Sequence, residues 1–119
     1  MKISNEQIEE FKNTGFLIVR NLYDAERMQE ITAWTDEVTN YPEVPGKYMM
    51  YFEESQLESG KRILSRMEDI EPFHKGFSDL FTKGEIQQVT SQLFDDEAVL
   101  FKDKINFKMP GGDGFKAHQ

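Results

Sequence analysis

The residues that could do chemistry gather in the stretch LFKDKINFKMPGGDGFKAHQ, residues 100–119. Polar and apolar side chains alternate through its first half, and an alternation with a period of two places the two kinds on opposite faces of a strand. The polar face would either be solvated or line a cavity that holds an anionic ligand. Alternation alone does not separate these two readings. The polar set is Lys102, Lys104, Asn106 and Lys108, and Asp103 is the one polar residue on the apolar side.

A glycine-rich turn, Pro110 to Gly114, follows that strand, and residues 115–119 read as the opening of another strand. The turn lacks both the lysine-serine or lysine-threonine pair and the helix start of a phosphate-binding loop, so it is predicted to be an ordinary turn. His118 taken alone is weak evidence for a site. A single histidine is more often a packing or hydrogen-bonding residue than a ligand, and the same holds for His74.

Four helices are predicted to position these residues. The first has a capping box formed by Ser4 and Gln7 and a left-handed stop at Gly15. The other three start at Asp24, at Pro72 and, after Gly84, at Glu85. Their core-facing residues recur at helical spacing: Met28, Ile31, Trp34 and Val38; Phe73, Phe77, Leu80 and Phe81; Ile86, Val89 and Leu93.

Four strands are predicted, and short turns do not connect them into hairpins. Consecutive strands are usually neighbours in a sheet, so we expect several of these to lack a partner within the chain. All four helices are expected to pack against the apolar face of the last strand. The strands are Phe16–Val19, Tyr48–Phe52, Arg62–Met67 and Leu100–Met109.

Composition excludes several classes of function. Asp and Glu number 22 against 14 Lys and Arg, giving a net charge of −8 that suits a nucleic-acid backbone poorly. There is no cysteine, hence no disulfide, thiolate nucleophile or zinc–thiolate site. Apolar runs are too short for a signal peptide or a membrane span. We therefore expect one cytoplasmic domain over residues 1–119 that binds neither nucleic acid nor membrane.

The end of the predicted strand, the glycine-rich turn and the pair His118-Gln119 together resemble the phytanoyl-CoA dioxygenase family of iron(II)- and 2-oxoglutarate-dependent oxygenases. In that family a strand ending in Lys-x-Pro, a glycine-rich turn and a His-Gln-Asp sequence commonly follow one another. Lys108-Met109-Pro110 matches the first of these elements. The stretch NTGFLIV, residues 13–19, matches the pattern found near the family's N-terminus.

The resemblance implies an α+β fold: N-terminal helices and the first strands of a double-stranded β-helix (jelly-roll, cupin-like), with the barrel incomplete in this chain. It implies iron(II), with 2-oxoglutarate as cosubstrate and dioxygen as oxidant, hydroxylating a small-molecule substrate. His118 takes the place of a metal ligand in the two-His-one-carboxylate triad. Arg66 and Asn106 match positions that can bind 2-oxoglutarate, although Arg66 could equally be a solvated arginine or one paired with Glu68 or Asp69.

The family pattern continues beyond His118-Gln119 with an aspartate, a distal histidine and a later basic residue. We therefore expect residues 1–119 to be the N-terminal part of a dioxygenase domain about twice as long or longer. The parent protein is expected to be an active enzyme and the 119-residue chain alone to be inactive. An exposed strand edge would let the chain associate with itself.

Two other functions stay open on the residues alone. One is a binding module that reuses the fold without catalysis, because fold and function are separable. The other is a helical interaction domain with no metal site, which predicts that Lys104 and Asn106 face solvent and that the strands pair among themselves. The substrate is not predicted.

Overall fold

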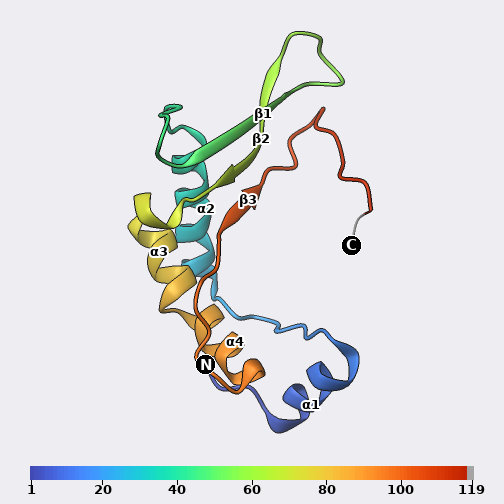
Figure 1. The fold of residues 1–119 in the computed structure, drawn as a ribbon, viewed down its shortest axis with the longest axis vertical. Coiled ribbons are helices and arrows are strands. Elements are labelled where there is room, and N and C mark those ends of the chain that lie inside the picture. The colour runs from blue at the N-terminus through green and yellow to red at the C-terminus, as the bar shows by residue number, and fades with distance from the viewer. Residues whose placement is uncertain (118–119) are drawn as a thin grey trace.

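The structure, a computed structural model, describes residues 1–117 and is a mixed α+β arrangement. Figure 1 shows an elongated molecule in which α2 and α3 lie beside a small sheet, while α1 and α4 lie together at the other end. The helices are α1 (Asn5–Thr14), α2 (Ala25–Thr39), α3 (Lys75–Thr82) and α4 (Glu85–Phe94), with a 3-10 turn η1 (Glu71–Phe73). The strands are β1 (Met49–Glu54), β2 (Arg62–Glu68) and β3 (Lys104–Asn106).

Local capping signals place α1 and α2 where the sequence predicts them. The Gln7 amide donates to the Ser4 hydroxyl at 3.2 Å and the Ser4 amide donates to the Gln7 side chain at 2.9 Å, which completes the capping box of α1. Gly15 ends α1 with φ 81°, and Asp24 caps α2. Among residues 1–117, no helix has both the length and the apolar character needed to cross a bilayer.

The helix predicted from Pro72 is broken, and this prediction needs correction. Pro72 lies inside the short 3-10 turn η1, and α3 starts only after His74, whose φ of −141° and ψ of 107° are extended. The Phe77 amide donates to His74 Nδ1 at 3.1 Å, so this buried imidazole caps α3. Its Nε2 lies 3.3 Å from a carboxylate oxygen of Glu37 and therefore carries the hydrogen. The side chain that caps α3 thus also ties it to α2.

The three strands form one antiparallel sheet in the order β1-β2-β3. Contrary to the prediction, β1 and β2 are joined directly as a hairpin through residues 55–61, and β3 finds its partner within the chain. The polar loop between β1 and β2 is long enough to reverse the chain although it carries no two-residue turn motif. The register of β1 and β2 shifts between Tyr51 and Phe52, where Ser65 is the extra residue in β2.

The apolar run Phe16–Val19 is not a strand, and that prediction is wrong. These residues lie in neither helix nor strand, and Phe16 and Ile18 are 58% and 62% exposed. Figure 1 shows this segment as an extended connection from α1 towards α2, away from the sheet. A short apolar run favours a strand only when another strand lies beside it, and none does here within residues 1–117.

The strand predicted over Leu100–Met109 is reduced to the three residues of β3. Its partner β2 ends at Glu68, which pairs with Lys104, and the chain then turns at Asp69 with φ 59°. Nothing in β2 therefore lies opposite residues 100–103, and Phe101 is 95% exposed. The predicted alternation is nevertheless in the right phase, because Ile105 packs against the core and Lys104 is exposed. Residues 115–117 are not in a strand.

The core lies between the helices and one face of the sheet. Val38, Met67 and Ile70 are fully buried there, and α2 and α3 contribute most of the helical side chains. The prediction that all four helices pack on β3 is therefore too broad, since α1 contacts α4 and contains no buried residue. The remaining core residues are Tyr48, Phe77 and Leu80, with Ile105 and Phe107 among those packed against them.

Candidate functional site

Tyr51, Arg66 and Asn106 form a row across the three strands. Arg66 is the cross-strand partner of Tyr51 on β1 and of Asn106 on β3. Directly opposed residues in antiparallel strands share a face. The neighbouring residues Met67 and Ile105 point into the core under the helices, so the row lies on the opposite, open face. The two residues predicted to bind 2-oxoglutarate are thus brought together, while His118 lies outside the described residues.

The Arg66 side chain is held in place from two directions. Its guanidinium carbon lies 4.1 Å from the centroid of the Tyr51 ring, and its Nε lies 3.0 Å from a carboxylate oxygen of Glu68. The Nε atom is shielded from solvent, but its N–H is not aligned for a hydrogen bond. Within residues 1–117 the two terminal nitrogens make no hydrogen bond. A guanidinium in this state can offer its planar fork to a carboxylate or another oxyanion.

A second row, Met49, Glu68 and Lys104, runs beside the first. Lys104 and Asn106 are exposed, and in the described part of the chain Lys104 has no ion-pair partner. Exposure of these two residues, together with pairing among the three strands, is the outcome predicted for an interaction domain.

Asp103 has a structural role that was not predicted from the sequence. Its buried carboxylate accepts hydrogen bonds from the backbone amides of Ile70 at 2.8 Å and Glu71 at 3.2 Å. These two hydrogen bonds hold the start of η1, which follows β2, next to Asp103, which directly precedes β3. They thereby set the register that places Asn106 opposite Arg66. The signal was present in the sequence as a lone aspartate on the apolar side of the alternation.

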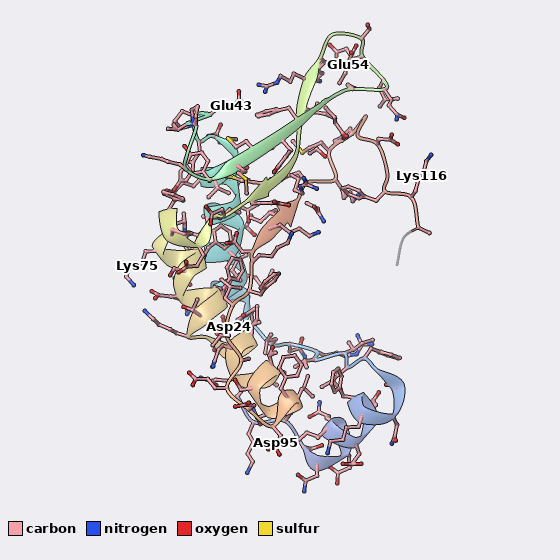
Figure 2. All side chains as sticks on the ribbon, in the orientation of Figure 1. Asp24, Glu43, Glu54, Lys75, Asp95 and Lys116 are labelled. Carbon is pink, nitrogen blue, oxygen red and sulfur yellow. The ribbon has the colours of Figure 1, made fainter. Side chains whose placement is uncertain are left out.

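The glycine-rich turn is an ordinary turn, as predicted, and it docks on the tip of the β1–β2 hairpin. The Gly112 amide donates to the Met109 carbonyl at 3.0 Å, and the Gln56 amide donates to the Gly111 carbonyl at 2.8 Å. Gly111 has φ 85°, and a Cβ placed there would collide with the Ser55 hydroxyl. Figure 2 shows this segment approaching the hairpin near Glu54 and then turning away through Lys116.

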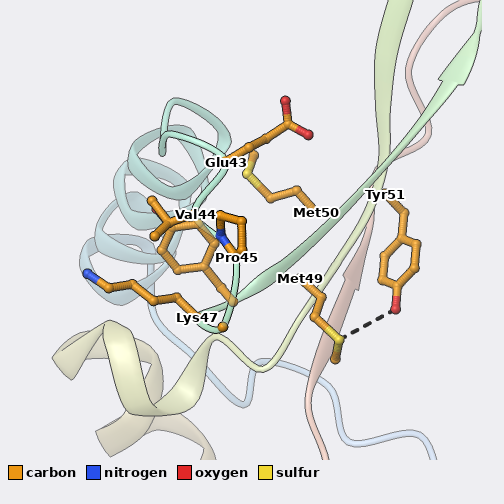
Figure 3. Close-up of a pocket in the computed structure, with 9 residues that line it drawn as sticks. Glu43, Val44, Pro45, Lys47, Met49, Met50 and Tyr51 are labelled. Atoms are coloured by element: carbon orange, nitrogen blue, oxygen red, sulfur yellow. Dashed lines mark hydrogen bonds between the residues drawn. The ribbon is translucent and has the colours of Figure 1, made fainter.

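Two hollows flank the open face. One of about 470 Å³ is lined by residues 43–51 at the outer edge of β1, and Figure 3 shows Met49 and Tyr51 on the same side of that strand. The other, of about 270 Å³, is lined by Met49, Glu68, Asp69, Glu71 and residues 100–103. The first is larger, but it lies beside the backbone of β1 and not over Arg66. Neither hollow encloses the row of Arg66 and Asn106.

The residues that the structure describes contain no group of three or more His, Cys, Asp or Glu side chains placed to hold a metal ion. The one predicted ligand, His118, falls outside them, so its role stays a prediction. Three ligands are what a two-His-one-carboxylate site requires. The row across the three strands offers instead the Arg66 guanidinium opposite the Asn106 amide, which suits an anion.

Comparisons with known proteins point to oxygenases. The chain is 40% identical over 116 residues to a 2-aminoethylphosphonate dioxygenase of the uncultured bacterium HF130_AEPn_1, and 34% identical over 117 residues to a methylphosphonate hydroxylase of Gimesia maris. It is 28% identical over 120 residues to the dioxygenase lolE1 of Epichloe uncinata. Each match covers 98% of this chain but only 44% or 45% of the relative, so the chain spans less than half of their length. No family model matches, and neither does any solved structure.

Proposed function

We propose that residues 1–119 are the N-terminal part of an iron(II)- and 2-oxoglutarate-dependent dioxygenase of the phytanoyl-CoA dioxygenase family. The observation that carries this proposal is the 40% identity, over 98% of the chain, to a protein named as a dioxygenase. The α+β architecture and the oriented Arg66 support it. In this proposal the small sheet is the beginning of a double-stranded β-helix, and further strands close over its open face.

Arg66 and Asn106 would hold 2-oxoglutarate in such an enzyme. The Arg66 guanidinium would donate two parallel hydrogen bonds to a carboxylate of the cosubstrate. The side-chain amide of Asn106, the cross-strand partner of Arg66, would donate to an oxygen of the same ligand. Tyr51 would keep the guanidinium plane fixed by stacking. His118 would be one of the iron ligands, and bound iron(II) would supply the Lewis acidity and redox chemistry that dioxygen activation requires.

A small organophosphonate is the proposed substrate. Two of the matched relatives are named for action on phosphonates, 2-aminoethylphosphonate and methylphosphonate. A phosphonate is a compact anion that cationic side chains recognise. The exposed Lys104 of the open face would attract such a ligand locally, although the whole chain carries a net charge of −8.

The first test uses the isolated chain. With one proposed metal ligand it should neither bind iron(II) stoichiometrically nor release succinate from 2-oxoglutarate, because affinity at such sites comes from several ligands held together. Anaerobic iron titration followed by a succinate assay measures both. Iron-dependent succinate release by the isolated chain would show that a site is assembled from other residues.

The second test joins residues 1–119 to the part of the 2-aminoethylphosphonate dioxygenase that they do not match. The chimera should release succinate with iron and 2-aminoethylphosphonate, and Arg66→Met should raise its KM for 2-oxoglutarate about tenfold or more. Circular dichroism and size-exclusion chromatography establish that each chimera is folded. A folded chimera without activity, or an unchanged KM, would contradict the proposal.

A non-catalytic interaction domain is the second candidate function. The exposure of Lys104 and Asn106 and the pairing of all three strands with one another favour it. Its partner could be a second copy, because β1 and β3 are edge strands in the sheet of the described residues. Sedimentation velocity over a hundredfold range of concentration would reveal such association, and the chimera assay separates the two candidates.

A further inference from the structure

We propose that Glu68 is a displaceable counter-ion of Arg66. When an anion binds to Arg66, the Glu68 carboxylate leaves the guanidinium and forms an ion pair with Lys104 instead. The inference rests on the proposed anion site at Arg66. It adds a positioning role for Glu68 and Lys104, which neither the sequence nor the comparisons assign. On binding to the open face, the carboxylate of the ligand then replaces the Glu68 carboxylate at the Arg66 guanidinium.

Glu68 keeps the empty Arg66 in a defined place. The two side chains are only 29% and 15% exposed, and the Nε of Arg66 is shielded from solvent. A cation in such a setting needs a nearby negative charge, because partial burial weakens its hydration. Glu68, two residues along the same strand face, supplies that charge at 3.0 Å. The Tyr51 ring stacks on the guanidinium as a second support.

The contact between Glu68 and Arg66 is nevertheless easy to replace. It joins one carboxylate oxygen to Nε, and the N–H at that atom is poorly aligned. Within residues 1–117 the terminal nitrogens make no hydrogen bond. An incoming carboxylate could take two parallel hydrogen bonds from the fork, which is the stronger arrangement. The ligand would therefore compete well against Glu68 for the same guanidinium.

Lys104 offers the displaced carboxylate a new partner. It is the direct cross-strand partner of Glu68, and the Cβ atoms of such pairs lie about 5 Å apart. Lys104 is exposed and makes no ion pair in the described residues, so it is available. The hollow that Glu68 helps to line is a less favourable place for its carboxylate, because Asp69, Glu71 and Asp103 also line it, with Lys102 as the single cation. Repulsion from three carboxylates directs Glu68 towards Lys104.

The test is a titration of the 119-residue chain followed by NMR at the Nε–Hε group of Arg66. The resonance is assigned by its loss in Arg66→Lys, and the ligands are 2-oxoglutarate and succinate, with chloride at matched ionic strength as the blank. Glu68→Gln should tighten binding about fivefold, because no internal carboxylate then competes. Glu58→Gln removes the same charge from an exposed pair with Lys61 and should change affinity by less than about twofold.

Lys104→Met tests the transfer itself. It should weaken binding about threefold in the otherwise unchanged chain and by less than about twofold in the Glu68→Gln background. Equal weakening in both backgrounds would show that Lys104 contacts the ligand directly, which overturns the transfer. Unchanged or weaker binding by Glu68→Gln overturns the counter-ion role. If the Arg66 resonance moves in none of the variants while their spectra show a folded chain, the proposed anion site itself fails and the inference falls with it.

Discussion

The two ends of this molecule are stabilised in different ways. At one end α2, α3 and the sheet enclose Val38, Met67 and Ile70, all with no exposed surface. At the other end α1 has no buried residue, and the connection after it exposes Phe16 and Ile18. Yet α1 is as well formed as α2. Local capping is therefore enough to set the limits of a helix, whereas an apolar run becomes buried only where other elements surround it.

Polar contacts hold the α1 end to α4. The Ile3 amide donates to the Gln92 side chain at 3.0 Å, and the Gln92 amide group donates to the Met1 carbonyl at 2.9 Å. Ile3, 3% exposed, is the main apolar anchor. Hydrogen bonds of this kind contribute about 1 kcal/mol each, much less than a buried core side chain.

The largest effect is expected in the core. Met67→Ala should lower the free energy of unfolding by about 2–5 kcal/mol, because Met67 is fully buried and its removal leaves a cavity. Phe16→Ala, at the other end, should change it by less than about 0.5 kcal/mol. Urea unfolding followed by the fluorescence of Trp34, the only tryptophan, measures both. Equal losses would show that the two ends share one core after all.

A smaller effect is expected at the link between β2 and β3. Asp103→Ala should cost about 1–3 kcal/mol, because the buried amides of Ile70 and Glu71 lose their acceptor. The matched control is Asp36→Ala, which removes an exposed carboxylate from α2 and should be nearly neutral. The same unfolding experiment compares them. A neutral Asp103→Ala would mean that water replaces the carboxylate and that Asp103 does not set the register.

The smallest effect is expected at the glycine-rich turn. Gly111→Ala should destabilise the docking of this turn by about 1 kcal/mol, because φ is positive and the new Cβ meets the Ser55 hydroxyl. Gly114→Ala, with open space around it, should have no effect. Hydrogen exchange at the Gln56 amide, which donates to Gly111, reports the docking directly. Unchanged exchange in Gly111→Ala would place the turn free of the hairpin in solution.

Part of the candidate site could be predicted from sequence. The phase of the alternation placed Asn106 on the polar face and Ile105 in the core, because a strand has a fixed period of two. Its length could not be predicted, since the length of β3 depends on where β2 turns away at Asp69. Tyr51 was missed because its contact with Arg66 depends on the hairpin, which the loop sequence did not indicate.

The sequence by itself determined the features that act over one helical turn or less: the capping box of α1, the stop at Gly15, the start of α2 at Asp24 and the limits of α4. The tertiary structure decided which apolar runs are buried, which strands pair and that Asp103 reaches the amides after β2. The physical reason is the separation along the chain between the residues that must meet. A cap needs a partner three residues away, whereas the row through Arg66 needs three strands that only the folded chain brings together.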